Sequence, residues 1–352
     1  MWPFAGVGDE HAASIATASP NLLGTKITLL PNSDKSEGDF DTLEGGDMRL
    51  AQGTFRAAAA VGFIALASYW SSASAQAWVG PQGSLDLGLD YNFAKSDKVV
   101  GDAGLKFPDA GSTTHQETIS VEYVPIDRLG IGLSLPLASF EYTGSKTLYP
   151  HPGGGTYDDG SFHTTFTDLR GGARYQVLAD PIAISPIIEL SLPIANYETV
   201  GNTVAGRHLD ALHLGLAIGK IIDAFYVQAL YEFSIVQKYD RTADTAKQGQ
   251  NTSDGSLVIG YKLFDHRFDL NLDANFHITH GGIDFSTFGS NPQSDQLYHD
   301  AILREDQLLL GGGLGYQIND SLTVAAKYMV FVSGVNTQNA SVLAVGLAYS
   351  PL

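Results

Sequence analysis

Histidines and glycine runs are the residues of this sequence whose types could support metal or phosphate chemistry. The sequence has no cysteine and no His-Glu-x-x-His motif, so only scattered histidines could ligate a metal ion. The closest pair of interest, His277 and His280, is three residues apart in an extended segment, so the two side chains point to opposite faces. Gly153–Gly155 and Gly311–Gly313 do not precede a helix with Lys-Ser or Lys-Thr, as a phosphate-binding loop would. We therefore expect no metal site, no cofactor site and no catalytic residues.

Charged side chains at alternate positions of extended segments have a clearer interpretation. In Phe268–Thr279 apolar and polar residues alternate, so a strand there has one apolar face and one polar face. Strands of soluble proteins run to about five or six residues, whereas about 9–11 tilted residues span a bilayer, which this segment is long enough to do. The charges on such polar faces are candidates for lining an aqueous lumen: Asp168, Arg170, Arg174, Glu189, Glu232, Lys262, Asp269, Asp273 and Lys327.

The elements that must position these charges are long amphipathic strands joined by connections of two kinds. Twelve strands are expected, at about 83–94, 114–124, 129–140, 166–178, 182–195, 208–221, 225–237, 255–264, 268–279, 307–318, 322–333 and 341–352. Short connections alternate with long ones, and the long ones include Lys95–Thr113 and Gly334–Ala340. This pattern predicts an all-β fold, a transmembrane up-and-down antiparallel β-barrel of about 12 strands, with short periplasmic turns and long extracellular loops.

Aromatic residues support the same architecture. Six of them lie on the apolar face beside the short turns or near the C-terminus, where they would form a girdle at the periplasmic membrane interface. They are Tyr123, Tyr175, Phe225, Tyr261, Tyr316 and Tyr349.

Composition excludes two other classes of protein. The formal net charge is -18, and no basic stripe is present to neutralise a nucleic-acid backbone. No run of eighteen apolar residues occurs, which excludes a helical membrane protein. A soluble twelve-strand sandwich would show the same alternation, but the leader sequence, the strand lengths and the loop asymmetry favour the membrane barrel.

The first 75 residues have the pattern of an export signal with an extension before it. Residues 48–75 contain a positive start, an apolar core and the small-residue site Ala73-Ser74-Ala75, so we predict a signal peptide cleaved before Gln76. Residues 1–47 have no regular apolar period, and we interpret them as an untranslated or disordered extension, with translation starting at Met48. The barrel is then residues 76–352.

Two stretches resemble a known family. The strand Thr167-Asp168-Leu169-Arg170-Gly171-Gly172-Ala173-Arg174-Tyr175 after a glycine-rich loop, and Leu190-Ser191-Leu192-Pro193 in the next strand, are similar to the outer-membrane proteins grouped under the MetA pathway of phenol degradation. The resemblance covers most of residues 76–352. It implies a barrel that moves aromatic or other hydrophobic small molecules across the outer membrane, and it supplies no established site residues.

The sequence therefore favours an outer-membrane channel for small organic solutes, with passive diffusion through a narrow polar lumen. The alternative is a structural or adhesive barrel whose loops bind partners, in which the inner charges pair across the lumen and hold the barrel rigid. An enzyme is the least favoured hypothesis, because the His-x-Ser spacing of outer-membrane phospholipases is absent. The expected partners are outer-membrane lipid, lipopolysaccharide, a small organic solute and the barrel-assembly machinery during biogenesis.

Overall fold

The structure, a computed structural model, describes residues 77–144, 158–240, 247–264, 266–287 and 299–351. The chain divides into two compact units, Met1–Thr54 and Phe55–Leu352. The predicted extension 1–47 and the predicted signal peptide 48–75 lie outside the described residues. The barrel belongs to the second unit.

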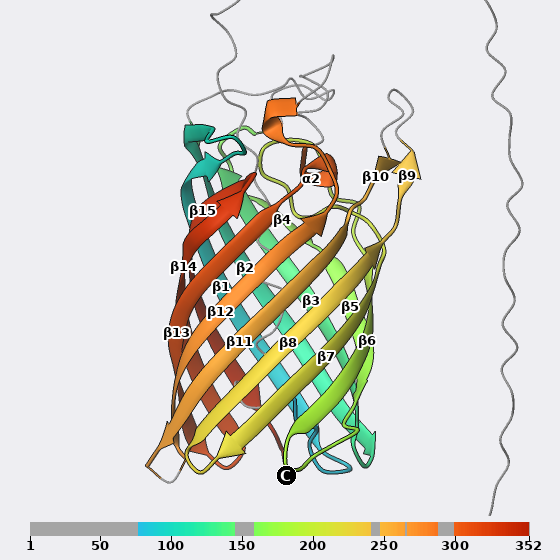
Figure 1. Cartoon of the computed structure of the whole chain (residues 1–352), viewed down its shortest axis with the longest axis vertical. Helices are drawn as coiled ribbons and strands as arrows, with labels where there is room; N and C mark the ends of the chain where they lie inside the picture. Colours follow the sequence, from blue (N-terminus) through green and yellow to red (C-terminus); the bar gives the residue numbers. More distant parts are fainter. Residues whose placement is uncertain (1–76, 145–157, 241–246, 265, 288–298, 352) are drawn as a thin grey trace, which may run out of the picture. The chain divides into compact units, whose positions relative to one another are not determined.

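Twelve antiparallel strands close into a barrel, with β4 and β5 together forming one of them (Figure 1). Each strand pairs with its sequence neighbours, and pairing of β1 with β15 closes the ring. The strands are β1 (Leu85–Val100), β2 (Lys106–Ile126), β3 (Leu129–Tyr142), β4 (His163–Phe166), β5 (Asp168–Tyr175), β6 (Ala183–Pro193), β7 (Ala211–Ile222), β8 (Phe225–Val236), β11 (Asn251–Leu263), β12 (Phe268–His280), β13 (Asp306–Asn319), β14 (Leu322–Val335) and β15 (Thr337–Tyr349). The predicted fold class and strand number are confirmed.

The barrel has an apolar exterior. Side chains at alternate strand positions are large, apolar and exposed, among them Leu87, Ile119, Leu133, Ile188, Leu214, Ile259, Leu272, Leu314 and Leu343. The positions between them are polar and buried, among them Asp90, Asn92, Gln116, Thr118, Gln228, Glu232, Asp273 and Gln307. A soluble sandwich would bury the first set and expose the second, so the sandwich alternative is wrong. An exposed apolar band around a closed barrel with a polar interior is the architecture of a membrane-spanning barrel.

The connections differ in length between the two ends of the barrel, with two exceptions to the expected pattern. The turns after β2, β7 and β13 are short, as predicted. The predicted long loop Lys95–Thr113 is mostly strand, because β1 and β2 continue past the barrel wall and only Gly101–Leu105 joins them. The predicted long loop Gly334–Ala340 is a tight turn at Asn336, whose φ of 53° is a left-handed conformation that asparagine tolerates. We call the two ends the long-loop end and the short-turn end.

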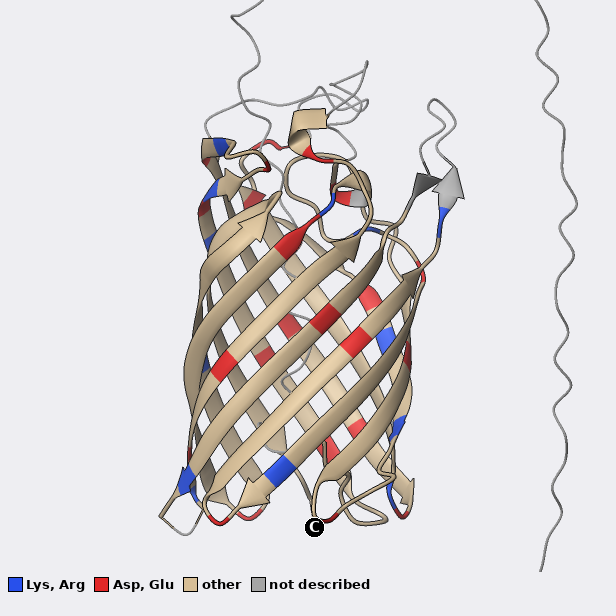
Figure 2. Ribbon diagram, in the orientation of Figure 1, with Lys and Arg blue, Asp and Glu red and all other residues tan. Residues whose placement is uncertain are grey.

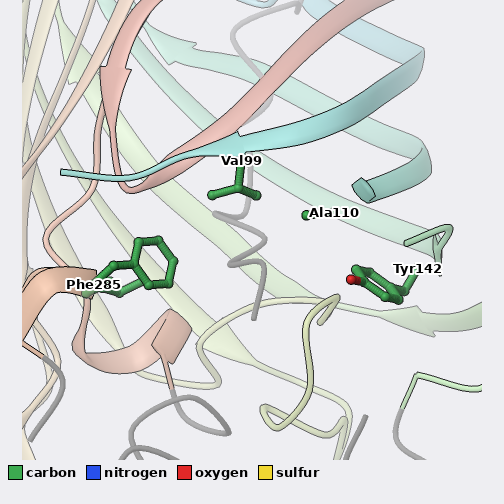
Figure 3. Close-up of a cluster of buried hydrophobic side chains, with 5 residues drawn as sticks. Val99, Ala110, Tyr142 and Phe285 are labelled. Carbon is green, nitrogen blue, oxygen red and sulfur yellow. The ribbon is translucent and has the colours of Figure 1, made fainter. Parts of the chain in front are cut away.

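Small elements at the long-loop end carry a core of their own. The strands β9 (Tyr239–Asp240) and β10 (Lys247–Gln248) pair there, and η1 (Phe285–Thr287) and α2 (His299–Ile302) lie between β12 and β13. Val99, Ala110, Tyr142 and Phe285, from four different elements, gather with Leu303 into a buried cluster (Figure 3). No helix of the described residues is long and apolar enough to span a membrane.

The chain enters β1 from inside the barrel at the short-turn end. Ala77 packs against the inward-facing Ala183, Ala217 and Leu230, and Trp78 packs beside it. Ser185 Oγ donates a hydrogen bond to the Ala77 carbonyl oxygen at 2.8 Å, and the Val79 N–H donates to Gln176 Oε1 at 3.3 Å. The N-terminal segment therefore occupies part of the lumen, which no sequence pattern had indicated.

Candidate functional site

A network of ion pairs crosses the inner wall in the half of the barrel nearer the long-loop end. Arg170 on β5 pairs with Glu189 on β6 and with Glu232 on β8. His213 on β7 lies between those strands, with Nδ1 3.0 Å from Glu232 Oε1 and Nε2 2.9 Å from Ser191 Oγ. Register explains the arrangement, because Glu189 is directly opposite His213 across the β6–β7 pair. Two glutamates are thus held by one guanidinium.

The network continues onto β11 and β12. Asp254 is directly opposite both Glu232 on β8 and His277 on β12. His277 Nδ1 lies 2.7 Å from Asp254 Oδ1, and Thr252 Oγ1 donates to Asp254 Oδ2 at 3.1 Å. Six adjacent strands, β5, β6, β7, β8, β11 and β12, therefore contribute to one continuous polar surface.

A cavity of about 180 Å³ lies against this surface. Its polar wall includes Asp168, Arg170, His213, Glu232, Asp254 and His277. Apolar side chains complete the lining, among them Pro136, Leu209, Ala211 and Val236. The cavity can therefore contact a small molecule through hydrogen bonds on one side and through apolar surface on another, as ligand sites commonly do.

The loop between β6 and β7 covers the cavity. Ala205, Gly206 and Arg207 line it from this loop, and residues 201–206 are buried. Tyr197 Oη donates a 2.5 Å hydrogen bond to Asp168 Oδ1 and accepts one from the His208 N–H at 3.1 Å. Burial raises the pKa of the Tyr197 hydroxyl, so it remains a donor at neutral pH.

Asp158 fastens the same loop from the connection between β3 and β4. Its Oδ1 accepts hydrogen bonds from the N–H groups of Asn202 at 2.9 Å and Thr203 at 3.2 Å, and its Oδ2 accepts from Asn202 Nδ2 at 3.1 Å. Burial raises the pKa of Asp158 to about 6, against the lowering effect of these hydrogen bonds. The contact that holds the loop over the cavity is therefore sensitive to pH.

The remaining predicted lumen residues lie on the inner face nearer the short-turn end. Arg174 pairs with Glu122 at 2.6 Å, and Lys327 pairs with Asp273. Tyr226 Oη donates to Asp269 Oδ1 at 2.8 Å, and Lys262 Nζ lies 6.0 Å from the centroid of the Tyr226 ring.

The structure thus brings Asp168, Arg170 and Glu232 together on the wall of the cavity, and Glu189 contacts Arg170. Arg174, Lys262, Asp269, Asp273 and Lys327 lie elsewhere on the inner face, in smaller pairs. A role for any of the nine in solute passage remains a prediction.

Sequence reasoning missed several cavity residues. Asp254 lay outside the predicted strand, which began at Gly255, whereas β11 begins at Asn251. Tyr197 and Arg207 lie in a predicted long loop, and alternation says nothing about the path of a loop. The alternation in β7 did place His213 on the polar face, but its contacts depend on strand register.

The six predicted girdle residues lie on the outer face at the short-turn end. Tyr123, Tyr175, Phe225, Tyr261 and Tyr349 are exposed, and Tyr316 is partly exposed. The Phe225 and Tyr261 rings are 4.5 Å apart between centroids, and Phe268 lies 4.7 Å from Tyr316. Phe264, which is 74% exposed, lies beside Phe268 at the same end. A membrane-interface role for this set remains a prediction.

Within the described ranges, no three His, Asp or Glu side chains lie where they could hold a metal ion. Gly311–Gly313 lies inside strand β13, while Gly153–Gly155 lies outside the described residues.

Comparison with known proteins yields structural likeness alone. No family model matches the chain, and no curated protein matches it. The solved structure of the COG4313 outer membrane channel from Pseudomonas putida F1 overlaps with a TM-score of 0.61 at 13% sequence identity, over 78% of this chain and 97% of that one. The chain has the barrel fold of that channel. This is the fold that the resemblance to the MetA-pathway proteins implied.

Two other solved barrels overlap less well. The translocator domain of the autotransporter NalP from Neisseria meningitidis gives a TM-score of 0.45 at 12% identity, covering 77% of this chain and 89% of that one. A mutant of the monoaromatic hydrocarbon channel TodX gives 0.40 at 15% identity, covering 77% and 91%.

Proposed function

We propose that the protein is a passive outer-membrane channel for small organic solutes, aromatic or otherwise partly hydrophobic. The observation that carries this proposal is the 180 Å³ cavity with one charged wall and one apolar wall, enclosed by a barrel with an apolar exterior. A cavity of about 150 Å³ accommodates benzene, so this one is large enough for a single ring with a polar substituent. The solved barrel with the same fold is described as an outer membrane channel.

Orientation and export complete the proposal. The long-loop end faces outward and the short-turn end faces the periplasm, as in other outer-membrane barrels. Residues 48–75 direct export, and the assembly machinery inserts the barrel. The exterior contacts lipid and lipopolysaccharide, the girdle residues mark the periplasmic interface, and the protein has no catalytic role.

Reconstitution tests the proposal. The purified mature protein in planar bilayers should give discrete conductance steps, and in liposomes it should support swelling with uncharged solutes up to a narrow size limit. Protein denatured before reconstitution is the control. Absence of both conductance and swelling would favour the alternative, a structural or adhesive barrel whose loops bind partners.

Occupancy of the lumen can be followed separately. The chain has three tryptophans, Trp2, Trp70 and Trp78, so removal of residues 1–75 would leave Trp78 alone, packed on the inner wall. Single-ring solutes that enter the barrel should change its fluorescence in a saturable way. A response that rises linearly with every solute would indicate partitioning into lipid or detergent instead.

A further inference from the structure

The charges on the inner wall of the barrel do not balance. The strands place nine carboxylates on this wall: Asp86, Asp90, Glu122, Asp168, Glu189, Glu232, Asp254, Asp269 and Asp273. They place four Lys or Arg side chains there: Arg170, Arg174, Lys262 and Lys327. Arg207 on the loop adds one more cation. With His213 and His277 counted as charged, the carboxylates still outnumber the cations. Figure 2 likewise shows more acidic than basic positions at mid-height on the strands.

Three of these cations are engaged in ion pairs with carboxylates of the wall. Arg170 contacts two glutamates, Arg174 contacts Glu122 and Lys327 contacts Asp273. Such pairs neutralise one another and leave little field for a passing ion.

The other carboxylates are mostly held by neutral donors. Tyr197 donates to Asp168, Tyr226 donates to Asp269, and Ser350 Oγ donates to Asp86. A hydroxyl group satisfies the oxygen without cancelling its charge. The carboxylates in excess of the cations therefore leave a net negative charge on the inner wall.

Asp90 differs from the other carboxylates of the inner wall in having no partner among the described residues. It lies on the inner face of β1, opposite Thr118 of β2 and Gly346 of β15, and is only 4% exposed. Among the described residues it makes no hydrogen bond and no ion pair. Its neighbours Gly88 and Gly346 carry no side chains that could cover it. A buried carboxylate that stays ionised without a partner costs free energy, so it is stabilised either by taking up a proton or by a cation or donor that comes to it. In a lumen a mobile cation can be that partner.

We infer that the lumen admits cations and neutral molecules in preference to anions, and that Asp90 is a specificity-determining residue for this preference. The inference rests on the proposed channel function and names the charge class of its solutes. Small organic ammonium ions and uncharged molecules are accepted, and organic carboxylates are rejected. Uncompensated acidic groups in a pore lower the energy of cations inside it and raise that of anions.

Reversal potentials in planar bilayers test the inference. Across a KCl gradient, the wild-type protein should be several-fold more permeable to potassium than to chloride. Asp90→Asn should lower this ratio by about threefold, since one charge a few ångströms from the path in water is worth a factor of that order. Asp90→Glu keeps the charge and should keep the ratio. Asp320→Asn, which removes a carboxylate from an exposed turn outside the lumen, should change nothing.

Organic ions extend the same measurement. Replacing potassium by benzylammonium should preserve a measurable cation current, whereas replacing chloride by benzoate should not add an anion current.

The outcomes separate the inference from the proposed function. Conductance without cation preference, or with a preference that Asp90→Asn leaves intact, would overturn the inference while the channel stands. If Asp90→Asn fails to assemble, the wild-type ratio and the organic-ion currents still decide the cation preference, and a ratio altered by Asp90→Glu would overturn the role of Asp90. Absence of conductance in every condition would contradict the proposed channel function, and the selectivity inference would fail with it.

Discussion

At the scale of single residues, Arg170 holds the polar wall of the cavity together. Its guanidinium contacts Glu189 and Glu232, and the Glu232 side chain is 2% exposed. One planar group with several donors suits two carboxylates on different strands, which a lysine could serve only as a point charge. Loss of this side chain would leave two carboxylates in a confined space, with His213 Nδ1 3.0 Å from Glu232 Oε1 as a remaining contact.

Replacing Arg170 with alanine should therefore destabilise the barrel strongly. Removing one partner of a buried ion pair costs about 3–5 kcal/mol, because the other charge is left uncompensated. Urea unfolding in detergent micelles measures the change. Arg128→Ala is the matched control, because Arg128 pairs with Asp127 at 3.6 Å on an exposed turn, where a pair contributes about 0–1 kcal/mol. Equal effects of the two variants would contradict the structural role of Arg170.

Selectivity gives a second readout of the same residue. Charge reversal by Arg170→Glu or Arg174→Glu adds negative charge to the wall and should increase the preference for cations. Reversal potentials measure it, and an unchanged ratio would assign both arginines to structure alone.

At the level of single residues, the sequence predicted which face of a strand a side chain lies on, but not which other side chains it contacts. Alternation placed Arg170, Glu189 and Glu232 on the polar face, because the period of a strand is two residues. Their contact depends on register across four strands, and each register is set by long-range pairing that one sequence does not display. Asp254 was missed for a simpler reason, since its strand begins four residues earlier than expected.

At the scale of elements, the connection between β6 and β7 is the part that departs most from a simple barrel. It was predicted only as a long loop, Asn196–Arg207, yet it folds over the cavity. Three hydrogen bonds to Asp158 and the Tyr197–Asp168 contact hold it there. Loops carry no periodic pattern that reports where they pack. By contrast, Lys95–Thr113 was mispredicted as a loop because β1 and β2 continue through most of it, beyond the apolar belt, where the alternation weakens.

Conductance should depend on pH through Asp158. Its pKa in the folded loop, about 6, lies above the ordinary value of 3.8. The docked loop therefore binds the proton more tightly than a released loop. Docking is strongest below about pH 4 and weakens as pH rises through 6. Burial also raises the pKa of Asp300, which interacts with Asp158, so its ionisation acts in the same direction. His163 also faces Asp158, and its interaction with the carboxylate lowers the pKa of Asp158, opposing the effect of burial.

We expect closures of the channel to be longer at pH 5 than at pH 7.5, and the difference to shrink in Asp158→Asn. The neighbouring Asp159 is the control. It is exposed, and the Ser161 N–H lowers its pKa, so it titrates below this window. Asp159→Asn should keep the wild-type pH dependence. Single-channel recordings decide between these outcomes. A pH response that survives in Asp158→Asn would mean that the Asp158 contacts do not control the closures.

At the scale of the whole molecule, closure distinguishes the barrel from a sandwich with the same alternating strands. The sequence showed two faces per strand, and both folds accept that pattern. The pairing of β1 with β15 and of β2 with β3 leaves no edge within the ring, so the leucines must face outward. This outcome could be favoured beforehand only through strand length, loop asymmetry and the predicted signal peptide, because closure is a property of pairings between the ends of the chain.

The lipid-facing exterior leads to a prediction that separates charge from size. Leu272 is 69% exposed on the outer face of β12, between Ile259 and Gly312 of the adjacent strands. Leu272→Arg should cost about 2–4 kcal/mol in a bilayer, the range for arginine facing the midplane lipid. Leu272→Ala removes the same side chain without adding charge and should cost much less. Both are measured by reversible unfolding in phospholipid vesicles and repeated in detergent, where water reaches the exterior more easily. A penalty for arginine that matches that of alanine in vesicles would mean that this face does not contact lipid, and the membrane barrel would have to be abandoned.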